Sequence, residues 1–231
     1  MSPELKTRFE LNDQIARANR ANFDAAGITT ISLIGPAGSG KTSLIEAMLP
    51  RLNSKLRIAV IVADLAAERQ VERISRHRCQ AIPLLTNDLA AINVREALSQ
   101  LNLKNFDLLL IESEGNAHSP VEFELGHHFR ASVFSVAGGD DKATEHPFLI
   151  AGSNMVLLTK IDLLPFVTFD FKVFKQDVMR VKPKMPIIQL SIESGQGIEQ
   201  WIEWVESHLT VRVGDRPSPR IFDPFIRISN P

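Results

Sequence analysis

The sequence is poor in three features that would each point to a particular class of protein. It holds one cysteine, Cys79, in 231 residues, which excludes an internal disulfide and suits a reducing compartment, so we expect a cytoplasmic protein. No apolar stretch approaches the ~20 residues that a membrane span requires, and residues 1–20 lack the apolar run of a signal peptide. The net charge is −1, so composition predicts no binding to nucleic acid or to an anionic membrane.

Short apolar and β-branched runs are present instead, and they alternate with segments of helical periodicity. This alternation predicts an α/β fold with a mostly parallel, twisted sheet and helices on both faces. The expected strands are 30–34, 57–63, 81–85, 107–111, 132–136, 155–159 and 186–190. The expected helices named from the pattern are 4–22, 42–52, 66–76, 94–101 and 198–209.

A glycine-rich segment, GPAGSGKT at 35–42, joins the first of these strands to the following helix. It matches the P-loop pattern G-x4-G-K-S/T in its required context, so the fold is expected to be that of a P-loop NTPase. Its backbone N–H groups would surround phosphate oxygens at a helix N-terminus, with Lys41 on the β- and γ-phosphates and the Thr42 hydroxyl on Mg²⁺. The residues expected to bind the phosphate groups are Gly35, Gly38, Ser39, Gly40, Lys41, Thr42 and Ser43.

Two carboxylates, Asp64 and Glu112, each follow a predicted strand. In a parallel sheet these strand ends face the crevice beside the P-loop, and Mg²⁺ prefers oxygen ligands. We therefore expect Thr42, Asp64 and Glu112 to hold Mg²⁺, and Lys41, Asp64 and Glu112 to form the catalytic group. Alternatively, each carboxylate is a helix N-cap or a solvated loop charge.

The segment TKID at 159–162 indicates which base the site accepts. Asp162 can accept hydrogen bonds from the ring N–H and the exocyclic amine of guanine, while Lys160 lays its aliphatic stem against the base and Thr159 precedes it. In the loop at Ser191 and Ile192, after the next strand, a backbone N–H could meet the guanine carbonyl oxygen. The expected nucleotide is therefore GTP or GDP. A solvated Lys–Asp turn is the alternative explanation.

These motifs divide the chain into three expected parts. Residues 1–27 form an N-terminal helical segment, 28–210 a P-loop GTPase domain, and 211–231 a C-terminal tail that contains proline. The tail has no lasting hydrophobic periodicity, so it either lies over the domain or is disordered.

Four further stretches carry the motifs of a known family. IESEGN at 111–116 resembles I-E-N-x-G-N, and KIDLLP at 160–165 resembles K-x-D-L-L-P. SV at 135–136 with GDDK at 139–142 resembles S-V-x-E-G-E-D-K, and SIESGQG at 191–197 resembles S-A-x-S/T-G-x-G. The chain thus resembles the HypB GTPases, which assist nickel insertion during maturation of nickel–iron hydrogenases, from about residue 11 to 209.

The resemblance implies a GTPase that binds GTP or GDP with Mg²⁺ and forms a homodimer that depends on the nucleotide. It also implies that the nucleotide state controls docking with a maturation accessory protein or a metalloenzyme client. The family's phosphate and magnesium roles carry over to Lys41, Thr42, Asp64 and Glu112.

The family's transition-metal ligands do not carry over. Ala90 and Ala91 stand where family members have a Cys-His pair, and Ser119 replaces a further cysteine. Alanine has no donor atom, so nickel or zinc has no ligands at that position. No transition-metal site is expected, and His118, next to the lost cysteine, is the weak candidate for a substitute ligand.

A second departure concerns turnover. Ala67 and Glu68 stand where the family has threonines after the strand-end aspartate, which predicts slow hydrolysis. Three functions therefore stay open at this point: a GTPase accessory protein of metalloenzyme maturation, a degenerate GTP- or GDP-binding module with little hydrolysis and no metal handling, and a nickel metallochaperone with a new ligand set.

Overall fold

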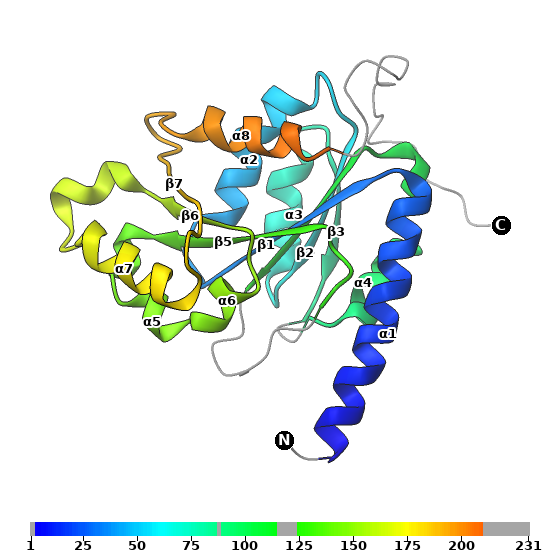
Figure 1. The fold of residues 1–231 in the computed structure, drawn as a ribbon. Helices are drawn as coiled ribbons and strands as arrows, with labels where there is room; N and C mark the ends of the chain where they lie inside the picture. Colours follow the sequence, from blue (N-terminus) through cyan, green and yellow to red (C-terminus); the bar gives the residue numbers. More distant parts are fainter. Residues whose placement is uncertain (1–2, 87–88, 115–123, 210–231) are drawn as a thin grey trace.

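Seven short apolar strands form one sheet at the centre of the structure (Figure 1), a computed structural model that describes residues 3–86, 89–114 and 124–209. The strand order is β3-β2-β4-β1-β5-β6-β7, and every neighbouring pair is parallel. The predicted parallel sheet is therefore confirmed. The strands are β1 (Thr29–Gly35), β2 (Ile58–Ala63), β3 (Gln80–Leu84), β4 (Leu108–Glu114), β5 (Phe129–Ser135), β6 (Met155–Thr159) and β7 (Ile187–Gln189).

Helices cover both faces of the sheet, as the sequence predicts (Figure 1). The α-helices are α1 (Pro3–Ala26), α2 (Lys41–Leu52), α3 (Ala67–Ser75), α4 (Ala91–Leu98), α5 (Lys142–Glu145), α6 (Pro147–Ala151), α7 (Phe171–Val181) and α8 (Ile198–Ser207). Three 3₁₀ turns join them: η1 (Leu103–Asn105), η2 (Val136–Gly138) and η3 (Ile161–Phe166). None of the described helices is long and apolar enough to cross a membrane.

The two faces bury different residues of the same strands. Helices α2, α3 and α8 pack on one face, where Val60 contributes to a core cluster that also holds Trp201. On the other face, α1 and α4 cover a cluster with Ile61 and Phe23, and α6 and α7 cover a third cluster with Phe174. Consecutive strand residues point to opposite faces, so a strand covered on both sides is apolar throughout, as β2 is.

Helix α1 is tied to the segment that leads into β5. The Asn12 and Asn19 side-chain amides donate to the carbonyls of Glu124 and Leu125, at 2.8 and 3.1 Å. Asn19 also donates to the carbonyl of Ala91 at the start of α4. These buried amides fix the helix beyond the hydrophobic contact of its apolar face.

Three expectations about the elements need correction or lie untested. Strand β4 continues through Glu114, so Glu112 lies inside the strand rather than after it. Helix α7 was missing from the expected elements; Asp170 caps it by accepting from the backbone N–H of Lys172 at 2.7 Å. The expected tail at 211–231 lies outside the described residues, so its arrangement stays a prediction.

Candidate nucleotide-binding site

The glycine-rich segment forms a tight loop between β1 and α2. Gly38 and Gly40 have φ angles of 73° and 93°, a region that side chains other than glycine rarely adopt. At Gly35 a Cβ atom would lie 2.1 Å from the carbonyl oxygen of Val133 in β5, so the adjacent strand leaves no room for a side chain. The loop therefore needs these glycines, and it ends at the N-terminus of α2, where anions bind favourably.

Lys41 bridges this loop from inside. Its amino group donates to the carbonyl oxygens of Gly35 and Pro36, at 2.8 and 3.1 Å. Burial lowers the pKa of Lys41, and the nearby charges of Glu112, Glu114 and Asp64 act in the opposite direction. Lys41 is thus a buried amine at the loop on which three nearby carboxylates act.

Thr42 and Glu112 meet across the floor of the site. The Thr42 hydroxyl donates to Oε1 of Glu112 at 2.5 Å, so the oxygen lone pairs of Thr42 are free to face a cation. The second oxygen of Glu112 is buried and has no hydrogen-bond partner among the described residues. Burial raises the pKa of Glu112, while the Thr42 hydrogen bond and the charge of Lys41 lower it.

Asp64 follows β2 at the same edge of the sheet. Its Oδ1 accepts from the backbone N–H of Ala66 at 2.7 Å, and its Oδ2 accepts from the side-chain amide of Gln70 at 3.0 Å. Its charge also acts on Lys41 and Glu112. Asp64 thus closes the turn that leads into α3, whose N-cap residue is Ala66, while its charge acts on Lys41.

An arginine that the sequence reasoning missed joins α3 to α2. Arg73 donates to Oγ of Ser43 at 3.2 Å and forms an ion pair with Glu46. Nothing in a single sequence distinguishes this arginine from the other charges of α3, because its role depends on how two helices pack. It places Ser43, expected to bind phosphate, in a contact with α3.

The segment expected to recognise the base, residues 159–162, is joined directly to the glycine-rich loop. The Thr159 hydroxyl donates to the carbonyl oxygen of Ser39 at 2.6 Å. Lys160 has a φ of 59°, and its amino group donates to the carbonyl oxygen of Gly38 at 2.8 Å. Two regions about 120 residues apart in the sequence are thus held together at one end of the sheet.

Asp162 and Ser191, both expected near the base, lie together. The Ser191 hydroxyl donates to Oδ1 of Asp162 at 2.5 Å and accepts from the backbone N–H of Ser194 at 3.1 Å. The backbone N–H of Ser191 itself donates to the carbonyl of Gln196. A free N–H for a base would therefore come from the residues after Ser191, beginning with Ile192.

Ala90 and Ala91, which stand where family members have the Cys-His metal ligands, lie at the start of α4. The backbone N–H of Ala90 donates to the side chain of Asn93, and that of Ala91 donates to Asn12. His118 and Ser119 lie outside the described residues. Among the residues that the structure does describe, no three His, Cys, Asp or Glu side chains are grouped to hold a metal ion.

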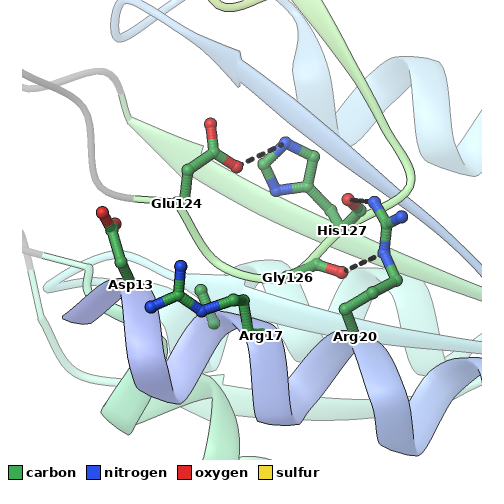
Figure 2. A pocket seen from close by; sticks show the side chains of 7 residues that line it. Asp13, Arg17, Arg20, Glu124, Gly126 and His127 are labelled. Carbon is green, nitrogen blue, oxygen red and sulfur yellow. Dashed lines mark hydrogen bonds and ion pairs between the residues drawn. The ribbon is translucent and has the colours of Figure 1, made fainter. Parts of the chain in front are cut away.

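A separate pocket of about 340 Å³ lies between α1 and the segment before β5 (Figure 2). Arg20 forms one wall because its guanidinium donates to the carbonyls of Gly126 and His127. The His127 ring is buried, and its Nε2 lies 3.8 Å from a carboxylate oxygen of Glu124. None of the residues expected to bind nucleotide lines this pocket.

The chain is similar to proteins of known name over most of its length. A CobW/HypB/UreG nucleotide-binding domain matches residues 29–189. The probable hydrogenase maturation factor HypB of Methanocaldococcus jannaschii is 35% identical over 204 residues, which cover 87% of this chain and 92% of that protein.

Solved structures give the same result. The hydrogenase maturation factor HypB of Archaeoglobus fulgidus has a TM-score of 0.79 at 29% identity and covers 86% of this chain and 98% of its own. HypB from Helicobacter pylori in complex with nickel has a TM-score of 0.78 at 25% identity, covering 84% and 93%. The chain therefore belongs to the CobW/HypB/UreG family of nucleotide-binding proteins and, within it, to the HypB family.

Proposed function

We propose that this protein is a Mg²⁺-dependent GTPase that serves as an accessory protein in hydrogenase maturation, with its nucleotide state controlling partner docking. The relatives named hydrogenase maturation factors support the role. The observation that carries the proposal is the direct bonding of the base-recognition segment to the P-loop through Thr159 and Lys160. That bonding joins the glycine-rich loop to the segment proposed to bind guanine, as a single nucleotide site would require.

The residues around Thr42 fit a magnesium ion. The buried second oxygen of Glu112 lacks a partner among the described residues, and the Thr42 hydroxyl donates its hydrogen bond to the first oxygen. Thr42, Glu112 and Asp64 would hold the ion directly or through water, as oxygen ligands do for Mg²⁺. When bound, the ion would neutralise charge on the β- and γ-phosphates.

The roles of the remaining residues follow from their positions. Lys41 would leave its two carbonyl contacts for the phosphates, because a phosphate oxygen carries more negative charge than a carbonyl. Asp162 would accept from the guanine ring N–H and amine. Asp64 would orient the attacking water as well as the ion. Hydrolysis is expected to be slow, since Ala67 and Glu68 offer no threonine hydroxyl to the γ-phosphate.

Nickel handling by this chain would differ from that of its relatives. The Helicobacter pylori structure contains nickel, but Ala90 and Ala91 in this chain supply no donor atoms, and the backbone N–H of each is already used. We propose that the chain acts on nickel delivery through protein contacts rather than as a carrier. Equilibrium dialysis should show no stoichiometric Ni²⁺ or Zn²⁺; a 1:1 complex would contradict this and direct attention to His118.

We further propose a homodimer that forms with GTP, in the cytoplasm. Phe166 at the end of η3 is 82% exposed and is a candidate for this contact, as is Leu65, which directly follows Asp64 and is 68% exposed. Light scattering with a non-hydrolysable GTP analogue should show a dimer, and Phe166→Asp should weaken it.

The experiment that tests the function compares phosphate release by the wild-type chain and by Lys41→Ala, with GTP or ATP, in Mg²⁺ or in EDTA. GTP hydrolysis should require both Lys41 and Mg²⁺. Lys55→Ala is the matched control. Lys55 lies just after the C-terminal end of α2, away from the glycine-rich loop, and forms an ion pair with Glu206. Lys41-independent release, or none, would contradict a GTPase and leave a nucleotide-binding module.

A further inference from the structure

Both oxygens of the Asp64 carboxylate are held by the beginning of α3. Oδ1 accepts from the backbone N–H of Ala66 at 2.7 Å, and Oδ2 accepts from Nε2 of Gln70 at 3.0 Å. One of these contacts comes from the backbone and would survive most substitutions. The other depends entirely on a side chain, and it fixes the rotation of the carboxylate about its last bond.

The orientation of the Gln70 amide is determined by this contact. An ionised carboxylate can only accept, so the NH₂ group of Gln70 must face Asp64. The amide oxygen then points the other way, where it is buried and has no hydrogen-bond partner among the described residues. A buried carbonyl without a partner costs about 1–3 kcal/mol.

This cost separates two explanations of Gln70. A residue that served only the packing of α3 would gain from an apolar side chain of the same length, because such a chain has no carbonyl to leave unpaired. Retaining a buried, half-satisfied amide is understandable when its N–H group has another task. Within the described part of the chain, that group donates to Asp64, whose charge acts on both Lys41 and Glu112.

We propose that Gln70 is a positioning residue of the nucleotide site, which holds the Asp64 carboxylate in the orientation needed for the Mg²⁺ ion and the attacking water. This inference rests on the proposed GTPase function and deepens it. Outer residues that orient the groups around a metal typically change affinity or activity by about 10–100-fold when they are removed.

The decisive variant is Gln70→Met, which keeps the length of the side chain and removes both the carbonyl and the NH₂ group of the amide. We expect kcat for GTP to fall about tenfold and the Mg²⁺ concentration for half-maximal rate to rise, with KM for GTP nearly unchanged because the base and phosphate contacts remain. The melting temperature should stay at or above that of wild type, since the unpaired carbonyl is gone. A merely structural residue would leave both kcat and the Mg²⁺ dependence of the rate unchanged.

A second variant, Gln70→Glu, adds a readout that packing cannot mimic. A carboxylate in place of the amide cannot donate to Oδ2 of Asp64 and repels its negative charge, although the side chain keeps its length. Gln70→Glu should therefore turn the Asp64 carboxylate away from its position, lowering kcat and raising the Mg²⁺ concentration for half-maximal rate at least as far as Gln70→Met does. Glu72→Gln is the control on the same helix; it removes only an exposed ion pair with Arg76 and should change nothing.

The outcomes separate this inference from the proposed function. If the wild-type chain shows Lys41-dependent hydrolysis and Gln70→Met matches its kcat and Mg²⁺ dependence, Gln70 has no positioning role. If the wild-type chain releases no phosphate, the proposed function fails instead. Mg²⁺-dependent affinity for a non-hydrolysable GTP analogue then decides about Gln70: an equal dependence in wild type and Gln70→Met overturns the inference.

Discussion

The Thr159 hydroxyl donates to the main-chain carbonyl of Ser39 at 2.6 Å, so the end of β6 is fixed to the phosphate-binding loop. Thr159 is fully buried. Thr159→Val keeps the shape and leaves the Ser39 carbonyl without this donor, a loss of about 1–3 kcal/mol. We expect about a tenfold weaker affinity for GTP and for GDP, measured by titration calorimetry.

The matched control is Thr144→Val. The Thr144 hydroxyl also donates to a main-chain carbonyl, that of Asp141, but at the exposed start of α5. Its affinity for GTP should equal that of wild type. If Thr159→Val also binds GTP like wild type, the connection between β6 and the loop does not support nucleotide binding.

Asp162 is expected to select guanine. Its Oδ1 accepts from Ser191, so in Asp162→Asn the amide oxygen would keep that bond and the NH₂ group would face the base. A donor there repels the exocyclic amine of guanine and suits the carbonyl of xanthine. Affinity should shift from GTP towards xanthosine triphosphate by at least about tenfold, the size of one lost charged hydrogen bond. Unchanged GTP affinity in competition titrations would remove the guanine assignment.

Glu112 is expected to cost stability and to support function. Burial raises its pKa in the folded chain above the ordinary value of 4.5, so the folded chain holds a proton that the unfolded chain has lost. Stability therefore falls as pH rises from 4.5 through the raised pKa. Glu112→Gln keeps an acceptor for Thr42 and has no charge to bury.

In the nucleotide-free protein, Glu112→Gln should melt at least about 2 °C higher than wild type at pH 7.5, since 1 kcal/mol corresponds to roughly 2–4 °C for a chain of this size. The same variant should lose most of the Mg²⁺ dependence of GTP binding. Calorimetry and a Mg²⁺ titration measure the two effects. A lower melting temperature together with intact Mg²⁺ dependence would show that Glu112 is a structural carboxylate.

The sequence was enough to predict the parallel sheet, because the sheet depends on local patterns. The run at 58–63 is apolar throughout, which a strand covered on both faces requires. Asp162 and Ser191 could be named as members of one expected site because the first follows the buried strand β6 and the second follows the short edge strand β7. The sequence pattern wrongly placed Glu112 just after its strand. A polar residue ends the apolar run in the sequence, but β4 continues through Glu112 to Glu114.

Contacts between helices could not be predicted in the same way. Gln70 and Arg73 lie on a charged helix whose polar residues look alike in sequence. The partner of Arg73, Ser43, is identified only once α3 is placed beside α2, and the partner of Gln70, Asp64, only once the turn between β2 and α3 is known. The charge of an isolated side chain carries no information about which buried group it faces, so such positioning residues need the three-dimensional structure.

The pocket beside α1 supplies the last prediction (Figure 2). Burial lowers the pKa of His127 well below its ordinary value of 6.5, and the charges of Arg130 and Arg20 add to the effect. Below pH 6.5 the unfolded chain therefore takes up a proton that the folded chain refuses. Stability is fully present above the unfolded pKa and is lost as pH falls towards the folded one, by at most about 1.4 kcal/mol per pH unit for one group.

His127→Gln should remove this contribution while keeping a polar side chain in the pocket. The free energy of unfolding is expected to fall less for the variant than for wild type between pH 7 and pH 5. The difference in this free energy between the two proteins should therefore narrow or change sign as pH falls. Urea unfolding at three pH values in this range gives both free energies. His128, whose pKa is also lowered, is present in both proteins and contributes the same pH dependence to both free energies of unfolding. Parallel pH dependences for wild type and His127→Gln would mean that His127 takes up its proton equally in the folded and unfolded chains.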